Sequence, residues 1–186
     1  MSVRLILVRH GETDWNRVNK LQGRIDILLN KNGIRQIRKT ATKLKKSGEK
    51  PRIIIASPLA RAMQSAGIIS TILEIPFTTN QNLSERDFGR LEGLTWKEIN
   101  KLYGPNFKER DRKQQYDYRP YGGESAREVR QRIFNFIAYA RKEYKGQTVL
   151  VVTHAGVLIY FSIMLRRAGM EFKHSLKPGA YCIIKL

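Results

Sequence analysis

Leu5-Ile6-Leu7-Val8-Arg9-His10-Gly11-Glu12, near the start of the chain, joins four apolar residues directly to a short polar segment. An apolar run of this length is too short for a stable helix and is typical of a strand buried on both faces of a sheet. Similar runs, rich in β-branched residues, lie at residues 53–56, 148–152 and 181–186, and residues 75–79 are a candidate fifth strand.

Helical patterns alternate with these runs. One segment, ended by Gly48, places its apolar residues on one helical face: Ile34, Ile37, Ala41 and Leu44. Ser57-Pro58 predicts an N-cap followed by proline at the first helical position, opening a helix through residue 73. Ser125 and Glu128 form a capping box ahead of an apolar stripe that reaches Tyr144, and a last helix is predicted over residues 156–168.

This alternation predicts an α/β fold, namely a three-layer sandwich in which a mostly parallel sheet carries helices on both faces. Residues 84–121 break the alternation. They predict a lid excursion over the C-terminal edge of the strands, with one short helix near residues 95–103. The sequence has no internal repeat, low-complexity tract or Pro/Gly-rich linker, so we expect a single domain over residues 1–186.

The composition favours a cytoplasmic protein that makes no use of a membrane. The apolar runs are too short to span a bilayer, and the first residues lack the apolar region of a secretory signal. Cys182 is the only cysteine and has no second thiol for a disulfide or a metal site.

The chain is strongly basic, with 35 Lys and Arg against 16 Asp and Glu and a formal charge of +19, which favours anionic partners. Residues 31–52 contain nine basic residues and one acid, Glu49. A solvated surface is the simpler interpretation of this cluster. Nucleic-acid binding is the alternative, although the cluster contains no aromatic residue on which bases could stack. The sequence also leaves a homodimer open.

Two arginines and two histidines should meet at one edge of the predicted sheet. Ligands of open α/β sheets bind beyond the carboxyl ends of the strands. Arg9 and His10 end the first strand, Arg61 follows the second within its helix, and His154 ends the fourth. Any one of these residues alone would more often be structural or solvent-exposed, but a chance meeting of all four is much less frequent.

This set of side chains suits a phosphoryl group. Arginine presents paired donors to phosphate oxygens, and a neutral imidazole is a competent nucleophile toward phosphorus. The sequence has no Walker-type loop and no clustered acids for magnesium, so the arginines would have to neutralise the phosphate charge without a metal or another cofactor.

The motifs that follow resemble the signature of the histidine phosphatase superfamily, in its phosphoglycerate mutase-like branch. They occur in family order along nearly the whole chain: Leu7-Val8-Arg9-His10-Gly11-Glu12-Thr13 with Asn16, Gln22-Gly23-Arg24 with Asp26, Gly33 and Gln36, Ser57-Pro58-Leu59-Ala60-Arg61-Ala62, Leu83-Ser84-Glu85-Arg86-Asp87-Phe88-Gly89 with Glu92-Gly93, Gly123-Glu124-Ser125, and Thr153-His154-Ala155-Gly156-Val157.

The resemblance implies a role for each matching residue. His10 matches the nucleophile that becomes phosphohistidine, and Glu85 matches the proton donor to the leaving oxygen. The residues that match contacts to the phosphoryl group are Arg9, Arg61, His154 and the supporting Asn16. Gln22 and Gly23 match substrate contacts, although Gly23 could equally well only make a turn. Three positions depart from the family pattern, Leu28, Asn30 and Tyr121, and they affect loop shape and not the chemistry.

The resemblance implies a phosphatase that acts on small anionic phosphorylated metabolites, with a phosphoglycerate mutase as the alternative. Mutases of this branch carry an insertion between the Glu-Gly and Gly-Glu-Ser elements and a C-terminal tail. Here 29 residues, 94–122, separate those elements, and the sequence ends at its last predicted strand, which favours hydrolysis. A non-catalytic binding module is a third interpretation, and the intact catalytic set argues against it. The excursion offers candidate lining residues, which could equally well only pack or face solvent: Tyr103, Phe107, Tyr116, Tyr118 and Arg119.

Overall fold

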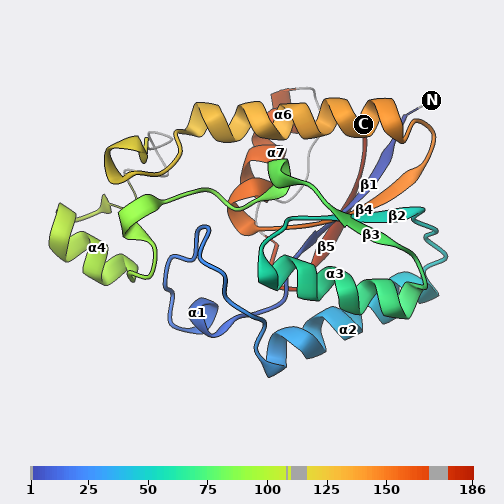
Figure 1. Ribbon diagram of the computed structural model, residues 1–186, viewed down its shortest axis with the longest axis horizontal. Helices are drawn as coiled ribbons and strands as arrows, with labels where there is room; N and C mark the ends of the chain where they lie inside the picture. The colour runs from blue at the N-terminus through green and yellow to red at the C-terminus, as the bar shows by residue number, and fades with distance from the viewer. Residues whose placement is uncertain (1, 108, 110–116, 168–175) are drawn as a thin grey trace.

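The computed structural model describes residues 2–107, 109, 117–167 and 176–186 (Figure 1). Its five-stranded sheet has the order β3-β2-β4-β1-β5. The strands are β1 Arg4–Arg9, β2 Ile53–Ala56, β3 Phe77–Thr79, β4 Thr148–Thr153 and β5 Tyr181–Lys185. β5 runs antiparallel to β1, and the remaining neighbours are parallel. The predicted α/β fold with a mostly parallel sheet is confirmed, and the candidate fifth strand is β3.

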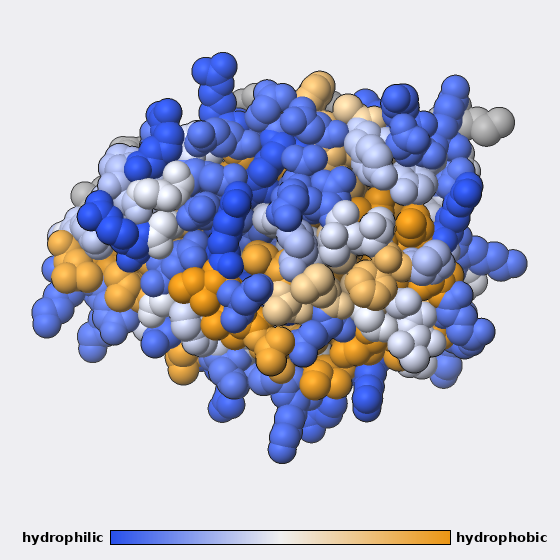
Figure 2. Space-filling view, viewed as in Figure 1, coloured by the Kyte–Doolittle hydropathy of each residue, from blue (hydrophilic) through white to orange (hydrophobic). Residues whose placement is uncertain are grey.

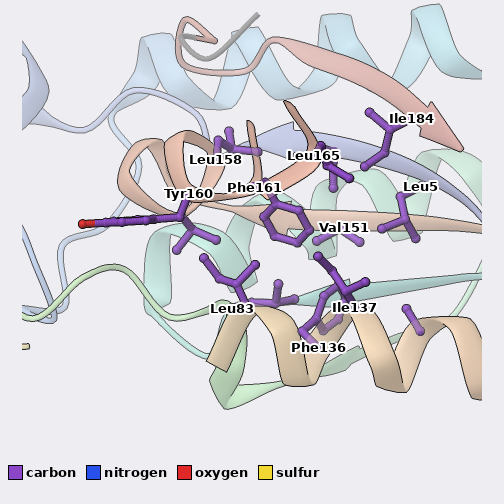
Figure 3. Packing of buried hydrophobic residues seen from close by; sticks show 14 of the residues in the cluster. Leu5, Leu83, Phe136, Ile137, Val151, Leu158, Tyr160, Phe161, Leu165 and Ile184 are labelled. Carbon is purple, nitrogen blue, oxygen red and sulfur yellow. The ribbon is translucent and has the colours of Figure 1, made fainter. Parts of the chain in front are cut away.

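Two pairs of helices cover the two faces of the sheet. In Figure 1, α2 (Lys31–Lys46) and α3 (Ala60–Leu73) lie on one face, and α6 (Ala126–Glu143) and α7 (Ala155–Arg167) lie on the other. Side chains of β1 alternate between the two resulting cores. Leu5 and Leu7 pack with α6 and α7, as Figure 3 shows for Leu5, and Ile6 and Val8 pack with α2 and α3. Because both faces are covered, the strand is apolar at every position between its ends.

The helix ends test the predicted caps. Ser125 and Glu128 form the capping box that opens α6, and Asn30 caps α2 by accepting a hydrogen bond from the amide of Gly33 at 2.8 Å. The predicted start of the next helix was wrong, because α3 begins at Ala60 and not at Pro58. Its first turn is capped from a distant loop, where the carboxylate of Asp26 accepts a hydrogen bond from the Ala60 amide at 2.8 Å.

The excursion extends beyond the sheet at the left of Figure 1 and has a small apolar cluster of its own. Its helix α4, Trp96–Tyr103, confirms the short helix predicted near residues 95–103, and a capping box of Thr95 and Glu98 opens it. The remaining short elements are helix α1 (Asp14–Arg17), which follows β1, and three 3₁₀ turns between β3 and α6, namely Gln81–Leu83, Gly89–Leu91 and Arg119–Tyr121. Buried Leu91, Ile99, Phe107 and Tyr118 form the centre of the cluster. The described residues of the excursion therefore pack around a small core of their own.

Hydrophilic side chains dominate the face drawn in Figure 2, with smaller apolar patches between them. Over the described residues, no helix combines the length and the apolar character that a membrane span requires.

Candidate active site

The carboxyl ends of three neighbouring strands bring the predicted residues together. Arg9 is the last residue of β1 and is paired in register with Thr153, which precedes His154. His10 continues the ladder by donating its amide hydrogen to the carbonyl of Thr153 at 3.0 Å. The rings of His10 and His154 then lie with centroids 5.1 Å apart.

His10 is held as a neutral imidazole of defined tautomer. Its Nδ1 lies 2.7 Å from the carbonyl oxygen of Gly11, and because a carbonyl only accepts, Nδ1 carries the hydrogen. Burial lowers the pKa of His10 well below its usual value, and the nearby guanidiniums of Arg61 and Arg9 lower it further. Nε2 therefore keeps a free electron pair at neutral pH.

His154 has the opposite tautomer. Nε of Arg61 donates to Nδ1 of His154 at 3.2 Å, so Nδ1 is unprotonated. Nε2 consequently carries the hydrogen and donates it to Oγ of Ser57 at 2.7 Å. Burial, followed by the charge of Arg61, lowers the pKa of His154 well below its usual value. The strand edge thus contains two neutral imidazoles: His10 presents a lone pair at Nε2, and His154 donates through its Nε2 to Ser57.

Arg61 is almost fully buried, with 1% of its surface exposed, and backbone carbonyls fix its direction. Nη1 donates to the carbonyl of Ile25 at 2.9 Å, and Nη2 donates to the carbonyl of Gly23 at 2.6 Å. Each of these nitrogens has a second hydrogen that the two carbonyls do not use. Burial lowers the pKa of Arg61, which indicates a cation held in a poorly solvated place.

One buried N–H group of Arg9 is unsatisfied among the described residues. Its Nη1 donates to the carbonyl of Leu176 at 2.8 Å, whereas its buried Nε has no hydrogen-bond partner among the described residues. Burial also lowers the pKa of Arg9, although the carboxylate of Glu85 acts in the opposite direction. Buried N–H groups are normally satisfied, so an orphaned one beside a second guanidinium fits an anionic ligand.

Glu85 reaches the same edge from the start of the excursion. Its carboxylate accepts hydrogen bonds from the amides of Arg86 at 2.9 Å and Gly156 at 3.2 Å, the second of which lies in the first turn of α7. A Cβ atom on Gly156 would stand 2.5 Å from Oε1 of Glu85, so the carboxylate occupies the space that the glycine leaves open. The preceding segment is fastened to β4 by the hydroxyl of Thr153, which donates to the carbonyl of Leu83 at 2.8 Å.

The three residues predicted to bind substrate have different surroundings. Asn16 is half-buried, and its Oδ1 accepts from the amide and hydroxyl of Thr13 in the capping box of α1. Gln22 is 9% exposed, and its Oε1 is a buried acceptor that lacks a partner in the described part of the chain. Gly23 has a φ of 51° and no room for a Cβ atom beside Glu92, so it does make the turn, and its carbonyl also holds Arg61.

Sequence reasoning missed the part that Ser57 plays. It was assigned as a helix cap, but its hydroxyl accepts from His154 and from the amide of Leu59 at 3.3 Å. The available signal was its position at the carboxyl end of β2, on the edge where ligands of such sheets bind.

The predicted lining residues divide into two groups. Phe107 and Tyr118 are fully buried in the excursion's cluster, which supports the packing interpretation for both. Tyr103 is 37% exposed, and Arg119 is exposed and paired with Asp117 at 2.6 Å. Tyr116 lies outside the described residues.

The charged hydrogen-bond donors of the site are the two guanidiniums. The remaining polar groups are the two neutral imidazoles and the carboxylate of Glu85. Within residues 2–107, 109, 117–167 and 176–186, no group of three or more His, Cys, Asp or Glu side chains is arranged to hold a metal ion. Such a pocket binds a phosphoryl group better than a cation.

An α/β enzyme with this pocket at the strand edge is a phosphatase of the histidine type. The family model of the histidine phosphatase superfamily (branch 1) matches residues 5–186, and the chain belongs to this family. Relatives include an uncharacterized phosphatase, PhoE, of Bacillus subtilis (36% identical, covering 82% of this chain and 72% of the relative) and a metal-independent phosphoserine phosphatase of Arabidopsis thaliana (36% identical, covering 91% and 71%).

A solved mycobacterial glucosyl-3-phosphoglycerate phosphatase in complex with VO3 is similar in fold and sequence. It has a TM-score of 0.80 and is 28% identical, with 88% of this chain and 82% of that chain covered. The resemblance to the superfamily stated from the sequence is therefore confirmed.

Proposed function

We propose that the protein hydrolyses phosphate monoesters of small anionic metabolites through a phosphohistidine formed on His10, without a metal ion. The observation that carries this proposal is the hydrogen bond from Nδ1 of His10 to the carbonyl of Gly11. It leaves Nε2 as an unprotonated nucleophile inside a pocket whose cations attract the substrate's phosphate.

In the first step, Nε2 of His10 attacks phosphorus and forms a P–N bond. The P–O bond to the leaving group breaks, its electron pair stays on the leaving oxygen, and Glu85 in its acid form protonates that oxygen. Arg9 and Arg61 supply N–H donors to the phosphoryl oxygens, with Asn16 in support, and His154 joins them when its Nε2–H turns from Ser57 to the bound phosphate. Because these groups are fixed before the substrate binds, they stabilise the charge of the transition state without reorganising.

In the second step, water attacks the phosphohistidine while Glu85, now a carboxylate, accepts a proton from the water. The P–N bond breaks, and its electron pair returns to Nε2 of His10. Phosphate leaves, and both residues regain their starting protonation. Gln22 and Gly23 are proposed to contact the substrate beyond its phosphate.

The arginines replace the charge that a metal would provide. Arg9 and Arg61 are buried cations that backbone carbonyls hold in place. Burial removes much of the water that would stabilise their charges, and a phosphate dianion would stabilise those charges instead. Activity on an aryl phosphate should therefore persist in a chelator.

A mutase reaction at the same site is the second candidate, because a relative from Xanthobacter autotrophicus named 2,3-bisphosphoglycerate-dependent phosphoglycerate mutase is 32% identical over 98% of this chain and 91% of its own. The two reactions share the phosphohistidine and differ in whether water or a second hydroxyl accepts the phosphoryl group. Product analysis distinguishes free phosphate from an isomerised phosphoglycerate.

The test is to trap the intermediate. Reactions quenched without acid should show a phosphoryl adduct on His10 by mass spectrometry, because phosphohistidine is acid-labile. His10→Ala should abolish the adduct and turnover, whereas the matched variant His154→Gln should slow turnover but still form the adduct on His10. Turnover that survives His10→Ala, or a wild-type protein without an adduct on His10, would refute the proposal.

A further inference from the structure

Helix α2 carries a basic surface that the catalytic site does not use. Between Lys31 and Lys46 the helix has no acidic residue, and its basic side chains, all of them exposed, are Lys31, Arg35, Arg38, Lys39, Lys43, Lys45 and Lys46. We call these seven residues the basic face. Its opposite side, which includes Ile37, Ala41 and Leu44, is buried against the sheet. The basic face therefore has a fixed orientation toward solvent.

The charges of the basic face are nearly all uncompensated. In the part of the chain that the structure describes, Lys45 is the only one of the seven that forms an ion pair, with Glu74 at 3.1 Å. Elsewhere the protein pairs its arginines, as Arg132 and Arg24 do with Glu124. Helix α6 has two acids, Glu128 and Glu143, among its five basic residues, whereas α2 has seven basic residues and no acid.

The arrangement opposes the stability of the helix itself. Lys31, Arg35, Lys39 and Lys43 follow one another at intervals of four residues, and like charges at this spacing repel. Lys31 also places a cation in the first turn, where the helix dipole favours an anion, whereas Lys43, Lys45 and Lys46 lie in the last turn, where it favours cations. A bound polyanion would relieve both effects, whereas a surface needed only for solubility could mix the two signs.

We propose that the basic face of α2 binds the phosphate backbone of double-stranded nucleic acid without sequence selectivity. At about 100° per residue, the seven side chains fan over roughly 160° of the helix, with Arg38 and Lys45 on one flank and Lys39 and Lys43 on the other. A convex ridge charged on both flanks complements a groove bounded by two rows of phosphates, and the major groove of DNA admits an α-helix.

Other polyanions fit this surface less well. Single-stranded nucleic acid is bound mainly through aromatic stacking, and α2 contains no aromatic residue. A membrane-binding helix inserts its apolar face between lipids, but the apolar face of α2 is already buried in the core. The lack of aromatic residues thus argues against single strands and not against a duplex.

The test compares two variants of the full-length protein that lose the same charge from opposite faces of the sheet. One carries Arg38→Gln, Lys39→Gln and Lys43→Gln in the basic face. The control carries Arg127→Gln, Arg141→Gln and Lys145→Gln, all exposed and located on or directly after α6. Binding of a labelled 24-base-pair duplex is followed by fluorescence anisotropy from 50 to 200 mM salt. The duplex has 5′-hydroxyl ends, so that no terminal phosphate can occupy the catalytic site.

The wild type should bind with a Kd of roughly 10⁻⁴–10⁻⁶ M at physiological salt. The α2 variant should bind at least tenfold more weakly, and its plot of log K against log salt should be shallower by about 2.7, because each lost phosphate contact removes about 0.9. The α6 control should stay within twofold of the wild type. Hydrolysis of an aryl phosphate should be unchanged in both variants, which also shows that they are folded.

The following results would contradict the proposal. If both variants lost the same affinity for the duplex, or if neither lost any, the basic face would not determine binding. Vesicles of phosphatidylcholine and phosphatidylglycerol that bind more tightly than the duplex, with the same loss in the α2 variant, would make a lipid surface the partner instead. A charge-preserving variant, Lys39→Arg with Lys43→Arg, should bind the duplex like the wild type, and its failure to do so would count against a charge-based contact.

Discussion

Replacing Gly156 by alanine should displace the proposed acid without altering its chemistry. The added Cβ atom would lie 2.5 Å from Oε1 of Glu85, and an ordinary contact needs at least 3.4 Å, so the carboxylate must move by about 0.9 Å (3.4 − 2.5). A misplacement of about 1 Å can reduce a rate by roughly 10²-fold. We therefore expect a 10- to 100-fold lower kcat/KM on an alkyl monoester such as glycerol phosphate.

The loss should depend on the leaving group. An activated aryl ester such as p-nitrophenyl phosphate needs little protonation of its leaving oxygen, so its hydrolysis should fall several-fold less than that of the alkyl ester. The stability should change little, because the gain of up to about 1 kcal/mol from alanine over glycine in a helix is opposed by the weakened hydrogen bonds of the displaced carboxylate. Steady-state kinetics on both esters, together with urea unfolding, measure these effects.

Gly67→Ala provides a matched control. Gly67 also lies in a helix, α3, and nothing stands within 4 Å of a Cβ atom built on it. This variant should gain up to about 1 kcal/mol of stability and keep full activity on both esters. If Gly156→Ala loses activity equally on both esters, or keeps full activity on the alkyl ester, then Glu85 is not the proton donor whose position the glycine protects.

Three further predictions concern the proposed phosphate-binding residues and the side chains that hold them. Arg61→Lys cannot hold the carbonyls of Gly23 and Ile25 and Nδ1 of His154 at once, so kcat/KM on an aryl phosphate should fall on the order of 10²–10³, and a loss below threefold would contradict its proposed role. Ser57→Ala leaves Nε2–H of His154 without its acceptor and should lower the free energy of unfolding by about 1–3 kcal/mol in urea titrations; an equally stable variant would argue against that hydrogen bond. Burial and neighbouring guanidiniums lower the pKa of both His10 and His154, so the unfolded chain binds protons that the folded protein excludes. Stability should be complete above pH 6.5 and decrease below it by up to about 1.4 kcal/mol per pH unit for each histidine, and urea unfolding between pH 7.5 and 5.5 should show a smaller pH dependence in His154→Gln.

The meeting of Arg9, His10 and His154 could be predicted because it follows from topology alone. Parallel strands end at a common edge, so residues that follow separate strands meet there whatever their distance in sequence. Short apolar runs were sufficient to locate those strands.

The support of the site could not be predicted in the same way. Arg61 is oriented by the carbonyls of Gly23 and Ile25, and every backbone carbonyl looks alike in a sequence. Ser57 shows the same difficulty, since serine before proline is a good helix cap and the local pattern gave no sign of a competing histidine 97 residues away. The hydroxyl accepts from the nearby amide of Leu59 and also from His154, and only the first of these contacts is local in sequence.

The type of partner that each arginine has separates structural from ligand-binding guanidiniums in this fold. Arg24 and Arg132 both donate to the carboxylate of Glu124, and Arg24 also pairs with Asp87 at 3.7 Å, so two carboxylates offset the two guanidiniums. Arg9 and Arg61 are instead held by backbone carbonyls and one imidazole, which satisfy N–H groups but carry no charge. A carboxylate in their place would compete with phosphate for the same donors. Neutral partners therefore fix the positions of Arg9 and Arg61 without neutralising their charges, and a dianion is the ligand that such a pair favours most.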